Sequence, residues 1–208
     1  GKLIFITGGA GSGKSEYAEQ RAEQLAAELG GPLYYIATMD PGPRDPDTVA
    51  RIAKHQRRRA DKGYTTIECP TNIASVRAQL LQTRASVSTH RGTLPRSSAT
   101  APCTDFMDSH GHTPHELSHA VFLLEDLTNL YANEVYGTAG HPHAIVAPIL
   151  QLATEAGAVI LVANELYRDG IRYAEETDRF LRELSARARK LAAAAEEAVE
   201  VVYGIPVR

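Results

Sequence analysis

The sequence predicts an α/β fold in which a mostly parallel β-sheet carries helices on both faces. Short apolar runs rich in β-branched and aromatic residues alternate with longer amphipathic segments, as in repeated strand–helix–strand units. With 208 residues, the chain is long enough for one well-buried domain of this class and short for two. We therefore expect a single domain over residues 1–208.

The expected strands and helices follow one another along most of the chain. The strands are the apolar runs at residues 2–7, 32–38, 64–70, 120–127, 158–165 and 199–207. The helices are the amphipathic segments at residues 16–29, 47–60, 73–82, 129–136, 145–156 and 175–198. Ligands of such sheets bind beyond the carboxyl ends of the strands, so the residues that follow each strand are the first candidates for a functional site.

The first expected strand runs into a glycine-rich loop that opens the first helix. Its residues are Gly8, Gly9, Ala10, Gly11, Ser12, Gly13, Lys14 and Ser15. Glycines let successive backbone N–H groups turn toward a polyphosphate, and the helix N-terminus adds the positive end of its dipole. We expect Lys14 to reach the β- and γ-phosphates and the Ser15 hydroxyl to bind Mg²⁺. A turn that merely joins a strand to a helix is the alternative, but the flanking segments satisfy the context of a P-loop.

Two acids, Glu125 and Asp126, stand at the end of the fourth apolar run. A carboxylate at a strand tip is the usual second nucleotide motif, where it holds Mg²⁺ through a water. Glu125 is the preferred Mg²⁺-side acid and Asp126 the second choice, although an acid at this place can instead cap the following helix. The next strand ends at Asn164 and Glu165, which we expect to face the same crevice in a role that stays open.

The helix expected between the second and third strands carries a histidine among arginines. Arg51, His55 and either Arg58 or Arg59 recur at three- or four-residue spacing and so share a face. A basic helix face is often simply solvated. Beside a phosphate-binding loop, however, an imidazole can attack phosphorus, because arginines neutralise the phosphates and favour the neutral ring.

Residues 83–119 break the alternation and are rich in Ser, Thr, Pro and His. This composition without a sustained period predicts an inserted loop. Its closely spaced histidines, His110, His112, His115 and His119, make a metal site conceivable. Their irregular spacing and the lack of paired cysteines favour a solvated insertion or lid instead.

The overall composition argues against several classes of protein. A net charge of −3 with 43% hydrophobic residues is ordinary for a globular protein, so a nucleic-acid partner is not expected. Cys69 and Cys103 fit no metal or redox spacing and are expected to be structural or incidental, in a reducing compartment. No apolar run approaches the ~20 residues of a membrane span. We expect a cytoplasmic protein.

Several segments together resemble the bifunctional adenosylcobinamide kinase / adenosylcobinamide-phosphate guanylyltransferase family. In chain order they are GGAGSGKS, YIAT, RIAKHQRRR, TIECP, LLEDLTNL, LVANE and VVYGIPV. The glycine-rich loop alone is shared by many nucleotide-binding proteins. Followed by R-I-x-x-H-x-x-x-R and a C-terminal G-I-P, it is far more specific.

The resemblance implies a RecA-like P-loop NTPase fold, often assembled as a homotrimer, that acts twice on one corrinoid with Mg²⁺. The terminal phosphate of GTP or ATP first passes to the hydroxyl of the aminopropanol arm of adenosylcobinamide. A histidine then attacks the α-phosphate of GTP and releases pyrophosphate. The guanylyl group finally passes to the new phosphate, giving adenosylcobinamide-GDP.

The resemblance also implies roles for particular residues. The family's nucleophile matches His55, its Mg²⁺-side acid matches Glu125, and a guanine contact matches Glu68. Its other nucleotide-contacting residues match Ala37, Thr38, Met39, Gln56, Arg57, Arg58 and Arg59. A carboxylate at Glu68 can accept from both N1–H and the 2-amino group of guanine, which predicts a preference for GTP.

Three stretches depart from the family pattern, namely residues 83–119, 165–173 and 184–190. They bear on the corrinoid pocket, on subunit packing and on whether both activities are retained, more than on nucleotide binding. Two other interpretations are open. One is a P-loop kinase of another small alcohol, in which His55 only contacts phosphate, and the other is a GTP-binding module without turnover.

Overall fold

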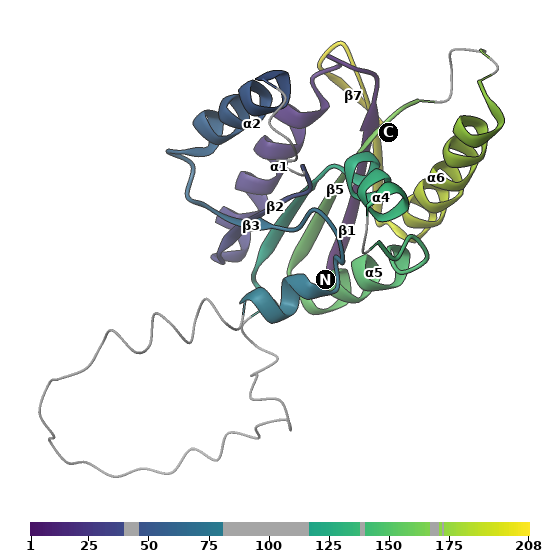
Figure 1. Cartoon of the computed structure of the whole chain (residues 1–208). Coiled ribbons are helices and arrows are strands. Elements are labelled where there is room, and N and C mark those ends of the chain that lie inside the picture. Colours follow the sequence, from purple (N-terminus) through teal and green to yellow (C-terminus); the bar gives the residue numbers. More distant parts are fainter. Residues whose placement is uncertain (40–45, 81–116, 138–139, 167–170, 172) are drawn as a thin grey trace, which may run out of the picture.

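A seven-stranded β-sheet lies at the centre of the described part of the chain in the computed structural model (Figure 1). The structure describes residues 1–39, 46–80, 117–137, 140–166, 171 and 173–208, without the side chains of residues 47, 48, 51, 54, 55 and 58. The strand order is β3-β2-β4-β5-β1-β6-β7. All neighbouring pairs are parallel except β6 and β7, which confirms the predicted mostly parallel α/β architecture.

The strands and helices alternate as the sequence predicts. The strands are β1 (Lys2–Gly8), β2 (Leu33–Ala37), β3 (Tyr64–Glu68), β4 (Val121–Glu125), β5 (Ala158–Asn164), β6 (Glu197–Val202) and β7 (Ile205–Val207). The helices are α1 (Lys14–Leu29), α2 (Pro46–Arg59), α4 (Leu127–Tyr136), α5 (Val146–Glu155) and α6 (Glu175–Ala194). Residues 75–80 are also helical.

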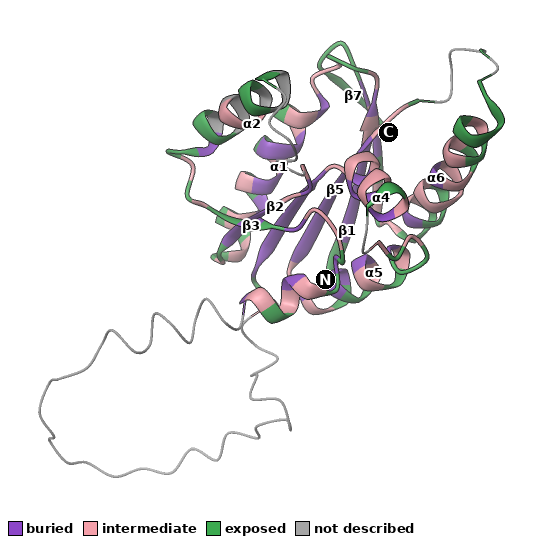
Figure 2. Ribbon diagram, viewed as in Figure 1, coloured by how far each residue is buried: buried purple, intermediate pink, exposed green. Residues whose placement is uncertain are grey.

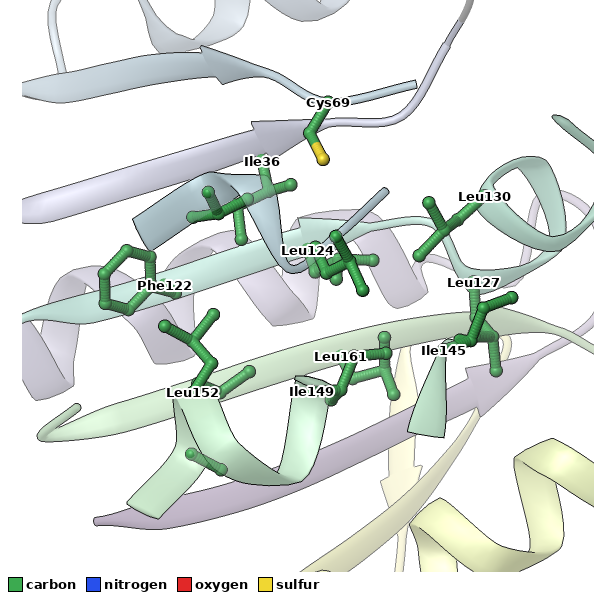
Figure 3. Packing of buried hydrophobic residues seen from close by; sticks show 14 of the residues in the cluster. Ile36, Cys69, Phe122, Leu124, Leu127, Leu130, Ile145, Ile149, Leu152 and Leu161 are labelled. Carbon is green, nitrogen blue, oxygen red and sulfur yellow. The ribbon is translucent and has the colours of Figure 1, made fainter. Parts of the chain in front are cut away.

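Helices cover both faces of the sheet because side chains alternate along each strand. On one face, Ile4 and Ile6 of β1 pack with Ala18, Ala22 and Leu25 of α1. On the other face, the apolar side chains of β4 and β5 share a core with α4 and α5 (Figure 3). Helix α6 adds Leu184 and Leu191 to this core and contacts β1. The central strands are buried along most of their length, whereas the outer sides of the helices are exposed (Figure 2).

The C-terminal region differs from the prediction in two places. The helix expected over residues 175–198 ends at Ala194, and β6 begins at Glu197. Alanines and glutamates favour helix locally, but residues from Glu197 pair with β1, and this pairing prevails over local propensity. The second difference concerns residues 199–207, where a single strand was expected. In the structure these residues belong to a hairpin formed by β6 and β7.

Part of the predicted insertion lies outside the described residues. The structure does not describe residues 83–116 of the insertion, which include His110, His112 and His115. The last two residues of the helix expected over 73–82 also lie outside the described residues. The remaining residues, 117–119, form a turn that leads into β4. The nitrogen Nδ1 of His119 lies 3.1 Å from the carbonyl oxygen of Leu29, so this histidine is tied to the end of α1.

Candidate nucleotide and phosphoryl-transfer site

The glycine-rich loop joins the end of β1 to the start of α1, where close packing requires glycine at two positions. A Cβ atom at Gly8 would lie 2.5 Å from Oγ of Ser12 and 2.6 Å from the carbonyl oxygen of Val201. Gly13 precedes α1 with a φ of 88°, in the left-handed region that favours glycine. No side chain caps the helix at Gly13, so the first N–H groups of α1 are open to a phosphate.

We expect Gly8→Ala to damage this loop and Gly9→Ala to spare its packing. The alanine methyl at position 8 would meet backbone at 2.6 Å, whereas a Cβ at Gly9 has nothing within 4 Å. Overpacking of this kind costs about 1–3 kcal/mol of the free energy of unfolding. Urea unfolding of the two variants measures the difference. Equal stability of both variants would contradict the packing described here.

Lys14, Ser15 and Glu125 meet at the start of α1. Lys14 is only 7% exposed, and its Nζ donates a hydrogen bond to the carbonyl oxygen of Gly9 at 3.0 Å. The Ser15 hydroxyl donates to Oε1 of Glu125. Burial lowers the pKa of Lys14, and the negative charges of Asp126 and Glu125 offset part of this effect. A cation, a hydroxyl and a carboxylate thus lie together at the glycine-rich loop.

Of the two acids, Glu125 faces the loop and Asp126 caps a helix. Oδ1 of Asp126 accepts from the backbone N–H of Asn129 at 2.7 Å, which makes Asp126 the N-cap of α4. Its Oδ2 accepts from the amide of Asn164 at 2.8 Å. Burial raises the pKa of Asp126, although the hydrogen bond from Asn129 opposes this shift. The geometry therefore favours Glu125 as the metal-side acid and gives Asn164 a role in anchoring Asp126.

The variant Asp126→Ala should unfold more easily than Asp126→Asn. Alanine removes the cap of α4 and leaves the half-buried Asn164 amide without this partner, which costs about 1–2 kcal/mol. Asparagine keeps an oxygen for the cap. The free energies of unfolding from urea titrations provide the comparison, and a destabilised Asp126→Asn with a stable Asp126→Ala would disprove the capping role.

The end of β2 is fastened to both acids and to α4. The buried hydroxyl of Thr38 donates to the carbonyl oxygen of Glu125 at 2.9 Å and accepts from the N–H of Asp126 at 2.8 Å. Asn133 of α4 donates to the carbonyl oxygens of Thr38 and Pro70 at 2.8 and 2.9 Å. The resemblance assigns Thr38 only to the nucleotide. No local pattern points to Asn133, because its partners are far away in the sequence.

A cavity of about 430 Å³ lies between α2 and the carboxyl ends of β2 and β3. It brings together six residues that the resemblance assigned to the nucleotide, namely Ala37, Thr38, Met39, Gln56, Arg59 and Glu68. Strand register sets Glu68, Ala37 and Glu125 side by side in one row across the sheet. Two strand spacings separate Glu68 from Glu125, about 10 Å, so the end of the cavity at Ala37 is one strand spacing from Glu125.

Arg59 is a buried cation inside this cavity. It is 6% exposed, and its Cζ lies 3.4 Å from the ring centroid of Tyr35. Its Nε and Nη1 have no hydrogen-bond partner among the described residues. Buried N–H groups of a guanidinium are costly when unpaired, and phosphate oxygens are the partners that guanidinium binds best. The hydroxyl of Tyr35 lies 3.4 Å from Oε2 of Glu125, which links the cavity to the P-loop.

Three further predicted residues, Arg57, His55 and Arg58, are not among the described side chains that line the cavity. Arg57 is exposed and does not line the cavity. His55 and Arg58 lie on α2, but their side chains are outside the described part of the structure. His55 belongs to the same helix as Ile52, Gln56 and Arg59, which line the cavity.

The oxygen ligands at the loop fit Mg²⁺. This ion takes one or two protein oxygens and keeps several waters, and Ser15 and Glu125 supply one oxygen each beside the phosphate-binding loop. The described residues contain no cluster of three or more His, Cys, Asp or Glu side chains that could hold a metal ion. Within the same residues, no helix has the length and apolar character to cross a membrane.

The loop between β1 and α1, its buried lysine and an acid at the tip of β4 define a P-loop NTPase. One strand, β5, separates β1 from β4, which is the RecA-like arrangement. The family model described as cobinamide kinase / cobinamide phosphate guanyltransferase matches residues 4–89 and 81–208. The chain therefore belongs to this family of bifunctional transferases of cobalamin biosynthesis, which use nucleotides as donors.

Comparison with curated proteins found no match. Among solved structures, the chain is similar to a KaiC-like protein from Pyrococcus horikoshii OT3, with 12% identity, a TM-score of 0.43, and coverage of 96% of this chain and 70% of the other. It is also similar to the flagellar accessory protein FlaH from Methanocaldococcus jannaschii, with 11% identity, a TM-score of 0.42, and coverage of 96% and 70%.

Proposed function

We propose that this enzyme phosphorylates adenosylcobinamide and then transfers GMP from GTP to adenosylcobinamide phosphate through a guanylyl-His55 intermediate. The cavity under α2 is the observation that carries the proposal. It combines a carboxylate for guanine at Glu68 with the buried guanidinium of Arg59, whose Nε and Nη1 have no hydrogen-bond partner among the described residues. Arg59 and His55 belong to the same helix, α2. Within the cavity, Glu68 lies in one row across the sheet with the metal-side acid Glu125.

In the kinase step, the P-loop residues position a nucleoside triphosphate and stabilise the charge of the transfer. The substrate hydroxyl oxygen attacks the γ-phosphorus, the bond to the bridging oxygen breaks, and a nucleoside diphosphate leaves while the hydroxyl proton is released. Lys14 and the N–H groups at the start of α1 bind the phosphate oxygens. Mg²⁺, held by Ser15 and Glu125, would neutralise phosphate charge when bound.

In the transfer step, one ring nitrogen of His55 attacks the α-phosphorus of GTP, and pyrophosphate leaves. A phosphate oxygen of adenosylcobinamide phosphate then attacks the same phosphorus, and the phosphorus–nitrogen bond breaks. Arg59 neutralises the phosphates of the bound GTP, while Glu68 accepts from N1–H and the 2-amino group of guanine. The covalent intermediate divides one displacement between two anions into two easier ones.

Covalent labelling tests this mechanism. Protein incubated with α-labelled GTP and Mg²⁺ should carry label after denaturation, the label should be lost in acid, and His55→Ala should carry none. His143→Ala is the control, because His143 is an exposed histidine outside the cavity. If neither the native protein nor the control is labelled, the guanylyl-histidine mechanism is wrong. It is also wrong if His55→Ala carries as much label as the native protein and the control.

Glu68→Gln should weaken the selection of GTP. The amide can accept only one of the two guanine hydrogen bonds and turns a donor toward the other, so we expect labelling by GTP to need roughly 10- to 100-fold more nucleotide. Glu28→Gln, on the exposed side of α1, is the matched control. Titration of labelling against GTP concentration measures the effect, and an unchanged titration would remove Glu68 from guanine recognition.

We further propose a homo-oligomer, in keeping with the trimers of the family that the sequence resembles. Light scattering during gel filtration measures its mass. A monomer at all concentrations would contradict this part of the proposal without affecting the chemistry.

A further inference from the structure

The β6–β7 hairpin packs its turn directly against the phosphate-binding loop. The turn consists of Tyr203 and Gly204, both with positive φ, 49° and 78°, as a two-residue type I′ turn requires. The N–H of Gly204 donates to the carbonyl oxygen of Ser12 at 2.7 Å. A Cβ at Gly13 would lie 3.1 Å from Cα of Gly204. Figure 1 shows the turn beside the segment that leads into α1.

Tyr203 is an unusual residue for this place. A left-handed backbone is unfavourable for a tyrosine, and Asn, Asp and Gly are the usual residues of such turns. The side chain is 94% exposed, so its ring contributes almost nothing to the packing of the described residues. An aromatic ring kept in an unfavourable and exposed position suggests a ligand rather than the fold as its reason.

The position of the turn beside the loop indicates which ligand the ring can reach. Lys14 and Ser15 bind the β- and γ-end of a nucleotide, with Glu125 on the β4 side of β1. The nucleoside end of the nucleotide must then leave the loop on a side other than that of β4. The hairpin begins on β6, the neighbour of β1 away from β4, whereas Glu68 lies on β3, four strand spacings or about 19 Å from β1.

We propose that Tyr203 stacks on the base of the nucleotide that donates its γ-phosphate from the P-loop. This inference rests on the proposed function and adds a second base position to it, separate from the guanine position at Glu68. Stacking on an aromatic ring tolerates every base, because each base presents a π-face. The kinase step therefore accepts ATP and GTP alike, while Glu68 confines the transfer step to GTP.

Fluorescence provides a direct test, because the chain contains no tryptophan. Tyr203→Trp places a single indole on the turn, and we expect its emission to be quenched by non-hydrolysable analogues of both ATP and GTP with Mg²⁺. Inorganic triphosphate should compete for the loop without quenching. Tyr136→Trp, at a 59% exposed position of α4, is the control and should not respond.

Kinetics provide a second test that keeps the turn intact. Tyr203→Asn removes the ring but suits the left-handed position. The KM for ATP and GTP in the kinase step should rise roughly 5- to 150-fold, the range expected for loss of one stacked base. Tyr203→Phe should keep the native KM, and labelling of His55 by α-labelled GTP should stay unchanged in both variants.

The outcomes separate this inference from the proposed function. If calorimetry shows nucleotide binding but neither analogue quenches the indole, Tyr203 does not contact the base and the inference is wrong, while the function stands. If emission changes with protein concentration rather than with nucleotide, the turn contacts a second copy of the chain, which also overturns the inference. If no nucleotide binds at all, the proposed function fails with it.

Discussion

Lys14→Met is expected to reduce phosphoryl transfer by about 10³-fold or more while the protein stays folded. The γ-phosphoryl group gains charge on its oxygens during transfer, and removal of a single aligned neutral donor already costs about 10²–10³ in kcat. Lys14 is a full charge at the helix start, almost completely buried at 7% exposure. Transfer of label from γ-labelled ATP or GTP to the corrinoid measures the loss.

The fold should tolerate this change because burial already disfavours the charged lysine. Burial lowers the pKa of Lys14, so the unfolded chain holds the proton more tightly than the folded one. Methionine fills a similar volume without a charge that has to be desolvated. The free energy of unfolding should therefore stay equal or rise slightly. Lys190→Met, on the exposed side of α6, should change neither property, and a Lys14→Met enzyme within tenfold of native activity would contradict the assignment.

Glu125→Gln is expected to lower the kinase rate by about 10²–10³-fold and to raise the Mg²⁺ concentration that the reaction requires. Glutamine keeps the shape of the side chain and can still accept from the Ser15 hydroxyl. It lacks the negative charge that holds a divalent cation and its waters in place. Initial rates over a Mg²⁺ titration separate a loss of metal affinity from a loss of rate at saturation.

The neighbouring acid supplies a matched control for this experiment. Asp126→Asn keeps the α4 cap and should retain activity within a few-fold, because Asp126 is occupied by Asn129 and Asn164. If Asp126→Asn loses activity and Glu125→Gln does not, the two acids have exchanged roles.

The parts of the site that the sequence predicts well are those built from neighbouring residues. A strand before residues 8–15 and a helix after them favour a phosphate-binding loop, and the alternation of apolar strands with amphipathic segments predicts the sheet. The resemblance to the family then selects Ala37, Gln56, Arg59 and Glu68. The structure brings these four residues to one cavity, although they come from three different elements.

The parts that the sequence did not predict depend on register and long-range contact. Consecutive residues at a strand tip point to opposite sides, so only the pairing of β4 decides that Glu125 reaches Ser15 while Asp126 caps α4. The two hydrogen bonds that the Asn133 amide donates to the carbonyl oxygens of Thr38 and Pro70 join three separate segments of the chain. The contact between the β6–β7 turn and the P-loop was missed for the same reason, because a single strand was expected there.

The most direct test of the whole account follows two labels into one product. Adenosylcobinamide is supplied with GTP that carries distinguishable labels on its α- and γ-phosphorus, with Mg²⁺ and no other nucleotide. Each molecule of adenosylcobinamide-GDP should contain one γ-derived and one α-derived phosphorus, Lys14→Met should incorporate neither, and His55→Ala should stop at the γ-labelled phosphate. A native product that carries only the γ-label would show a kinase without guanylyl transfer and would contradict the account.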